Sequence, residues 1–267
     1  MTKSLIINAD DFGFDEDATT GILDLLSIGK IPSTTVMANC VNEKDLILLK
    51  KIANIGIGLH LNLIEGVPIS PLKKIPDLIN EKGEFLGAKK FLKNAIFQKI
   101  PEEQVFMEVK AQLVFLESRG IKITHVDSHQ HIHQFPIIGK TIQNILEKLK
   151  VKKIRNSFPL AANFGFRPNV LKLFTKLNPI SRKDFICPEG LISNLSFGGE
   201  LTLKDFSNDL ISSYHNHSCL ELMTHPGIKD RNDSYLKRKK EYLFWKENPI
   251  QELLKEKKIE LIHYGNL

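Results

Sequence analysis

The stretch LIINADDFG, residues 5–13, is the part of the sequence that most directly predicts the fold. Residues 5–9 have the apolar character of a short buried strand, and the following run 16–30 places Ile22, Leu25 and Leu26 at helical spacing. A buried strand followed by an amphipathic helix is the repeating unit of α/β proteins. The beginning of the chain therefore predicts an α/β fold.

The same unit recurs along the rest of the chain. We predict strands at residues 33–38, 55–62, 121–128, 153–156, 220–225 and 259–263, and helices at residues 43–53, 101–120, 137–149, 169–177 and 202–215 and in a charged run that ends at Glu256. Repeated units of this kind give a parallel sheet, and about seven or eight of them in 267 residues favour a (β/α) barrel over an open sheet. No linker divides the chain, so residues 1–267 are expected to form a single domain.

Two segments interrupt the alternation. Residues 65–100, with three prolines near their start, are expected to be an insertion over the carboxyl end of the sheet, where substrate-covering loops belong. Residues 160–200 contain scattered glycine and proline and give a weak pattern. We expect these two segments to build the substrate pocket.

The charge of the chain does not indicate a nucleic-acid partner. The formal net charge of +6 comes from lysine-rich runs such as KRKK at 237–240 and KEKK at 255–258. Glutamate and apolar residues are interleaved with these runs and no aromatic–basic pattern accompanies them, so solvated helix faces are the better interpretation.

The cysteines and the hydropathy pattern indicate the compartment. Cys40, Cys187 and Cys219 are far apart and form no Cys-x-x-Cys, which argues against a disulfide scaffold or a thiolate zinc site and fits a reducing compartment. The first strand begins by residue 5, which leaves no room for a signal peptide, and no apolar run has the length of a membrane span. We therefore expect a cytoplasmic protein without a membrane partner.

The stretch HVDSHQHIH, residues 125–133, concentrates His125, His129, His131, His133 and Asp127 at odd positions, which share one face of an extended strand. Neutral imidazoles beside a carboxylate suit a borderline divalent cation such as zinc. One ion takes three or four protein groups, so some of these side chains must instead orient ligands, transfer protons or contact substrate. The alternative is a polar loop with incidental histidines.

Three more strand ends carry polar groups. Asp10 and Asp11 follow an apolar strand, where burial and mutual repulsion call for a compensating cation or a carboxylate held as a base, unless they form a helix-capping turn. His60 lies within an apolar strand, where a satisfied core histidine is the alternative, and His225 precedes a Pro-Gly turn. Parallel strands deliver their chemistry at their carboxyl ends, so these groups predict a common site.

These motifs resemble the YdjC-like carbohydrate deacetylase family, whose best-known members deacetylate chitooligosaccharides. The matching stretches are NADDFG at 8–13, GLHLNL at 58–63, THVDSHQHIH at 124–133, THPG at 224–227 and the closing ELIHYGNL. The resemblance spans essentially the whole chain. It implies a distorted (β/α) barrel of the polysaccharide deacetylase type, with one divalent cation held by one aspartate and two histidines.

Carried over by position, the resemblance implies that Asp11, His60 and His129 hold one Mg²⁺ or Zn²⁺ ion. Asp10 would be the general base and His225 a candidate acid. His125 stays open as a ligand because His-x-x-x-His serves that purpose in related deacetylases, but His129 lies nearer the end of the strand.

Other polar groups are expected around these residues. Arg155 would hold Asp10 charged or bind substrate, if it is not an ordinary surface arginine, and Asp127 would orient a ligand histidine. His125, His131 and His133 would contact substrate, support the ligands or replace His225 as the acid.

The expected reaction is attack of a metal-activated water on the acetamide of an N-acetylated sugar or oligosaccharide. A metal-dependent phosphoesterase and a non-catalytic metal-containing sugar-binding barrel are the alternatives. Members of the family are often dimers, so a homodimer is one expected state.

Overall fold

The computed structural model describes residues 3–160, 166–192 and 202–267, with seven strands in these ranges. The strands are β1 (Lys3–Phe12), β2 (Ser33–Val36), β3 (Gly56–Leu61), β4 (Val126–Ser128), β5 (Leu191–Ile192), β6 (Cys219–Thr224) and β7 (Ile259–Ile262). All paired strands run parallel, in the order β4-β3-β2-β1-β6-β5, with β7 paired to β1.

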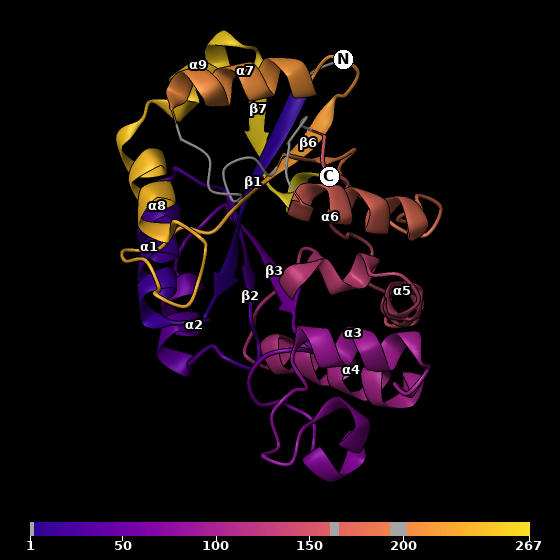
Figure 1. Cartoon of the computed structure of the whole chain (residues 1–267). Coiled ribbons are helices and arrows are strands. Elements are labelled where there is room, and N and C mark those ends of the chain that lie inside the picture. Colours follow the sequence, from indigo (N-terminus) through magenta and orange to yellow (C-terminus); the bar gives the residue numbers. More distant parts are fainter. Residues whose placement is uncertain (1–2, 161–165, 193–201) are drawn as a thin grey trace.

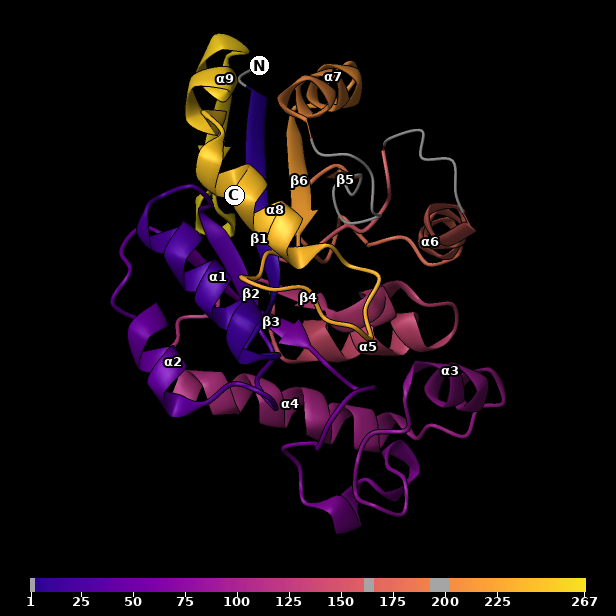
Figure 2. The ribbon, with the colours of Figure 1, turned by 60° about the vertical axis from the view of Figure 1, so that its left-hand side comes forward.

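The sheet curls into a half-barrel with helices around it (Figures 1 and 2). Isolated parallel bridges continue the pairing between β4 and β5, namely Val126 with Ile154, Lys153 with Ile186 and Pro159 with Leu191. The predicted strand at 153–156 is therefore present only as single bridges. The predicted fold class, a single-domain distorted (β/α) barrel, is confirmed.

The helices follow the predicted alternation. They are α1 (Glu16–Ser27), α2 (Glu43–Leu49), α3 (Ala88–Ile96), α4 (Glu102–Ser118), α5 (Ile138–Lys148), α6 (Phe166–Leu177), α7 (Leu203–Ser213), α8 (Arg238–Glu247) and α9 (Ile250–Glu256). Asp15 caps α1 by accepting a hydrogen bond from the backbone N of Ala18 at 2.7 Å. The predicted charged helix ending at Glu256 is divided into α8 and α9 at Pro249, whose ring removes a backbone donor. None of the described helices is long and apolar enough to cross a membrane.

The central strand β1 is irregular near its end. One edge pairs with β6, while the other pairs first with β7 and then with β2, with a register shift between Ala9 and Phe12. Asp11 lies within this shift and has a φ of 69°, a left-handed conformation that aspartate tolerates better than most residues. A bulge re-aims side chains, so the usual alternation between two faces of a strand does not apply to Asp10 and Asp11.

The insertion at 65–100 contains little regular structure. It contains two short 3-10 turns (Leu72–Lys74 and Pro76–Leu78) and α3, and it lies beside α4 at the lower part of Figure 1. Glu108 of α4 accepts hydrogen bonds from the backbone N of Ile69 and of Ser70, at 3.1 and 2.8 Å, which ties the insertion to that helix. A buried carboxylate that caps loop donors thus holds the start of the insertion on α4.

Candidate active site

A cavity of about 490 Å³ lies at the carboxyl ends of β1, β3, β4 and β6. Its polar lining includes Asp10, Asp11, His60, His129 and His225, so the structure brings these predicted residues together. From the insertion at 65–100 only Glu65 lines it, while α6 contributes Val170, Leu171 and Phe174 and the segment 225–238 contributes His225, Arg231, Asp233, Ser234, Tyr235, Leu236 and Arg238. The prediction that the 65–100 segment builds the pocket was therefore wrong for all of that segment except Glu65.

Asp11, His60 and His129 present one ligand atom each within 4.8 Å of one another. Asp11 Oδ1 lies 3.3 Å from His60 Nε2 and 3.2 Å from His129 Nδ1. The three residues come from separate strands or strand ends, as the sequence predicted. One carboxylate oxygen and two imidazole nitrogens form a donor set that suits a divalent cation of borderline softness.

The other nitrogen of each imidazole is held by a carboxylate. His60 Nδ1 lies 2.7 Å from Asp127 Oδ1, and His129 Nε2 lies 3.1 Å from Glu65 Oε2. Such carboxylate partners fix the ring orientation and leave the opposite nitrogen directed at the ion in metal sites. Glu65 was not anticipated, because it lies outside every motif.

The carboxylates around His60 and His129 favour the protonated, positively charged forms of both imidazoles. Burial lowers the pKa of His60, but the Asp127 and Asp11 carboxylates outweigh it and raise the pKa to about 10. Burial likewise opposes a charged His129, while hydrogen bonds to Asp11 and Glu65 raise its pKa. A site that binds protons this strongly can exchange them for a divalent cation, so the residues present fit a metal.

Asp10 is paired with the fully buried Arg155. Arg155 Nη1 donates to Asp10 Oδ2 at 2.6 Å and Nη2 donates to Asp10 Oδ1 at 2.7 Å. Burial raises the pKa of Asp10, but the guanidinium outweighs it and holds the pKa below its usual value. Arg155 is therefore not a surface residue, and it contacts Asp10, the partner expected in one of its two predicted roles.

Arg155 is in turn held by two more carboxylates. It contacts Asp127 Oδ2 at 2.9 Å and donates from Nη2 to Glu221 Oε1 at 2.7 Å. The Tyr264 hydroxyl donates to the other oxygen of Glu221 at 2.5 Å. Neither Glu221 nor Tyr264 was predicted, although Tyr264 belongs to the closing ELIHYGNL motif.

His225 also lies near Asp10. Its Nε2 is 3.9 Å from Asp10 Oδ2, and its backbone N donates to Glu241 Oε2 at 2.6 Å. Burial outweighs the nearby Asp11 and Asp10 carboxylates and lowers the pKa of His225 to about 4. The imidazole is therefore neutral at neutral pH, with one nitrogen able to donate and the other to accept.

The histidines of the 125–133 stretch do not share one face of an extended strand, contrary to the prediction. The chain leaves the strand after Ser128, and Gln130 and His131 have positive φ in a 3-10 segment at His129–Gln134. His131 lines the cavity with Nδ1 3.1 Å from the Ser157 hydroxyl. His133 is buried between the Ser128 hydroxyl and the carbonyl oxygen of Arg155, where it supports the backbone and not the cavity.

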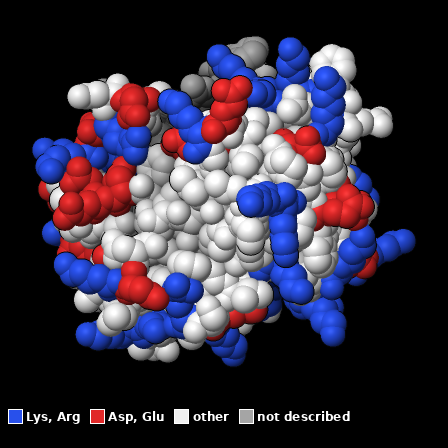
Figure 3. Space-filling model, turned by 90° about the horizontal axis from the view of Figure 1, so that it is seen from below, with Lys and Arg blue, Asp and Glu red and all other residues white. Residues whose placement is uncertain are grey.

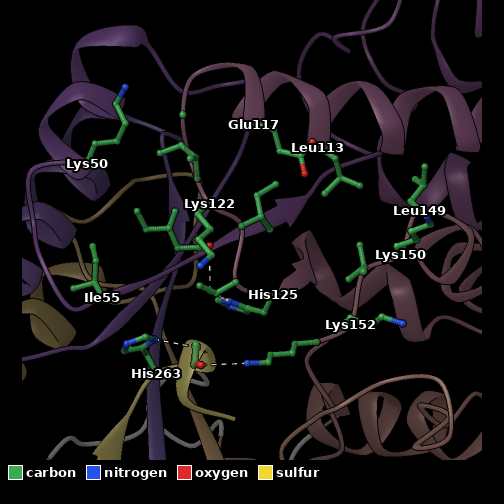
Figure 4. Close-up of a pocket in the computed structure, with 18 of the residues that line it drawn as sticks. Lys50, Ile55, Leu113, Glu117, Lys122, His125, Leu149, Lys150, Lys152 and His263 are labelled. Carbon is green, nitrogen blue, oxygen red and sulfur yellow. Dashed lines mark hydrogen bonds between the residues drawn. The ribbon is translucent and has the colours of Figure 1, made fainter.

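His125 lies in a different part of the molecule. It lines a second cavity of about 870 Å³, together with Lys122 and His263 (Figure 4). Its ring is stacked on that of Tyr264 with centroids 3.7 Å apart. The structure does not bring His125 to the Asp11 cluster, because it precedes β4 whereas His129 follows that strand.

One run interpreted as solvated contains a buried cation. Arg238, within KRKK, is 2% exposed, and its Nη2 donates to Asp11 Oδ2 at 2.5 Å. Glu241 is also buried and lies on the same face of α8 as Arg238 and Trp245, at positions i, i+3 and i+7. This spacing was the available signal, and the interpretation of the run as wholly solvated was wrong for Arg238.

Charged side chains elsewhere are mixed in sign. On the face shown in Figure 3, lysine and arginine alternate with aspartate and glutamate around an area of uncharged residues. Interspersed charges of both signs on this face are those of an ordinary solvated surface.

Comparisons with known proteins agree with the motifs. Residues 4–256 match the family model described as YdjC-like protein. The chain is 31% identical to carbohydrate deacetylase 2 of Listeria innocua over 98% of each chain, and 29% identical to chitooligosaccharide deacetylase of Proteus mirabilis over 86% of this chain and 83% of the relative. A crystal structure from Enterococcus faecalis V583, of a protein named as a candidate for cellobiose-phosphate cleavage, has the same fold, with a TM-score of 0.78, 23% identity and coverage of 100% of this chain and 99% of that one.

Proposed function

This chain belongs to the YdjC-like protein family, and on that premise we propose that it is a metal-dependent hydrolase that removes acetyl groups from N-acetylated sugars or oligosaccharides. Relatives named carbohydrate deacetylase and chitooligosaccharide deacetylase support the reaction and the substrate class. The observation that carries the proposal is the Asp11, His60 and His129 cluster beside the Asp10–Arg155 pair in one cavity.

Asp11, His60 and His129 would hold one divalent cation. Their two imidazole nitrogens suit Zn²⁺ better than Mg²⁺, which prefers oxygen ligands. When bound, such a cation would lower the pKa of water and polarise the acetyl carbonyl group. Asp127 and Glu65 keep the ligand rings oriented from behind.

Asp10 is the proposed proton acceptor for the attacking water. Arg155 keeps Asp10 ionised, and Asp10 Oδ2 lies 3.9 Å from His225 Nε2. The ion pair also lowers the basicity of Asp10, so a proton taken from water is readily passed on to the neutral imidazole of His225. His225 is the proposed group that delivers a proton to the departing sugar amine, which leaves acetate and the free amine as products.

A phosphoesterase with two metals is less well supported. A second cluster of Asp10, His60 and Asp127 has suitable atoms, but Arg155 already contacts both of its carboxylates. A fixed guanidinium at that position opposes a second cation by like-charge repulsion. The arrangement favours a single metal.

The test combines metal analysis with a product screen. The purified protein is expected to hold one divalent ion per chain and to release acetate from N-acetylated oligosaccharides. Chelation should abolish acetate release and added Zn²⁺ should restore it. Release of phosphate from sugar phosphates without acetate release, or of neither product, would refute the proposed reaction.

A further inference from the structure

Helix α8 places a buried carboxylate next to the proposed acid without exposing it to the cavity. Glu241 is 1% exposed, and Trp245, one turn further along the same helix, is fully buried. Glu241 does not line the cavity that holds Asp10 and His225. A buried carboxylate is costly unless hydrogen bonds or opposite charges compensate it, so its contacts indicate what it does.

Glu241 accepts hydrogen bonds from the end of β6. Its Oε2 accepts from the backbone N of His225 at 2.6 Å and from the Thr224 hydroxyl at 2.5 Å. The Thr224 oxygen accepts from the indole N–H of Trp245 at 2.8 Å, so the hydroxyl hydrogen is directed to Glu241. These bonds fix the backbone where the strand ends and the His225 side chain leaves it.

Close packing against α8 and α1 also holds this turn. The backbone N of Gly227 donates to the carbonyl oxygen of Arg238 at 3.1 Å, and a Cβ at position 227 would lie 3.2 Å from Arg238 Cβ. A Cβ on Gly21 of α1 would lie only 2.9 Å from Gly227 Cα. Helices α1 and α8, which lie side by side in Figures 1 and 2, therefore approach the turn after His225 so closely that the position of this turn relative to α8 is fixed.

We propose that Glu241 is a positioning residue, which holds His225 where its ring can reach Asp10 and the leaving amine. This inference rests on the proposed function, because it takes His225 as the proton donor. Glu241 acts through the backbone of His225 and has no contact with substrate. Arg238, on the same face of α8, makes the corresponding contact to Asp11.

Three variants separate this role from general support of the fold. Glu241→Ala removes the acceptor, Glu241→Gln keeps a carbonyl oxygen that can accept from His225, and Glu247→Ala removes an exposed carboxylate from the same helix as a control. In Glu241→Ala we expect kcat on an acetamide substrate to fall about 10- to 100-fold while KM changes less than about 3-fold. Glu241→Gln should recover most of the rate, and bound metal should equal that of the parent in all three. An equal fall in Glu241→Gln, or a loss of metal, would overturn the role.

A double variant tests whether Glu241 acts through His225. If it does, Glu241→Ala combined with His225→Ala should be no slower than His225→Ala alone. Losses that multiply in the double variant would mean that Glu241 contributes independently of His225.

Amide hydrogen exchange supplies a readout that needs no activity. The backbone N–H of His225 should exchange faster in Glu241→Ala than in the parent, and near the parent rate in Glu241→Gln and Glu247→Ala. Unchanged exchange in Glu241→Ala would refute the positioning role even in an active enzyme. A parent without acetate release would refute the proposed function instead, and the exchange rates would still decide whether Glu241 holds His225.

Discussion

Asp10→Asn is the substitution whose consequences follow most directly from the geometry. Asp10 accepts three hydrogen bonds, at 2.6 and 2.7 Å from Arg155 and at 2.9 Å from Asn8 Nδ2. Asparagine has one carbonyl oxygen and one amide NH₂, so a donor would face one of the guanidinium donors. Arg155 would keep its contacts to Asp127 and Glu221, so its charge would remain compensated.

The magnitude follows from these contacts. Loss of one charge-assisted hydrogen bond costs about 1.5–3 kcal/mol in the free energy of unfolding. For a chain of this size that lowers the midpoint of thermal unfolding by about 3–12 °C. Loss of the proton acceptor should lower kcat at least about 100-fold. The metal content should not change, because Asp11, His60 and His129 are all retained.

Acetate release, metal analysis and thermal unfolding measured on the same preparation test each part. Asp184→Asn, an exposed aspartate outside the cavity, is the matched control for the change of charge. Deacetylation near the parent rate would refute the general-base role of Asp10. Loss of metal together with activity would show instead that Asp10 and Asp11 had been exchanged in the assignment.

Three further outcomes are expected. His60→Ala should remove most of the bound metal while the fold remains, because it deletes one of three donor groups, and an unchanged ratio of metal to protein would exclude His60 as a ligand. Tyr264→Phe keeps the ring that stacks on His125 but removes the donor to buried Glu221, so urea unfolding should show a loss of about 1–3 kcal/mol, and no loss would contradict the contact. Burial outweighs the hydrogen bonds of Glu241 and raises its pKa from 4.5 to about 7. The free energy of unfolding that this group contributes is therefore complete below its pKa in the unfolded chain, and it is lost as the pH rises through about 7. The parent should therefore lose more stability than Glu241→Gln between about pH 5 and pH 8, and parallel stability curves would show that this carboxyl does not titrate there.

The elements that were predicted well are those whose signal is local. The apolar spacing of Ile22, Leu25 and Leu26 gave the buried face of α1, and Pro101 and Gly120 bracketed α4. A common site of the polar groups at the strand ends could also be predicted, because parallel strands bring their carboxyl ends to one edge whatever lies between them. The choice of Asp11, His60 and His129 among these groups came from the family resemblance. Position at a strand end could thus be inferred without knowing any contact.

Contacts between distant charged groups could not be inferred in this way. Arg238 pairs with Asp11 and Glu221 with Arg155, yet arginine and glutamate are ordinarily exposed. The spacing along α8 can mark Arg238 as buried, but nothing local names the partner of either residue. The contribution of the insertion to the cavity was overestimated for a related reason, since Glu108 of α4 holds the start of the insertion by capping loop donors. Such partners are specified only once the chain is folded.

The adjacent acids show how the two kinds of information combine. The sequence indicated that Asp10 and Asp11 could not both be buried and ionised without a compensating charge. The shifted register and the positive φ at Asp11 direct both carboxylates to the cavity, and each then has its own guanidinium, Arg155 for Asp10 and Arg238 for Asp11. Burial would raise both pKa values, but these cations lower them, so both groups stay ionised. Because Arg238 contacts only Oδ2 of Asp11, Oδ1 remains directed at His60 and His129, and the two neighbouring carboxylates can serve different purposes.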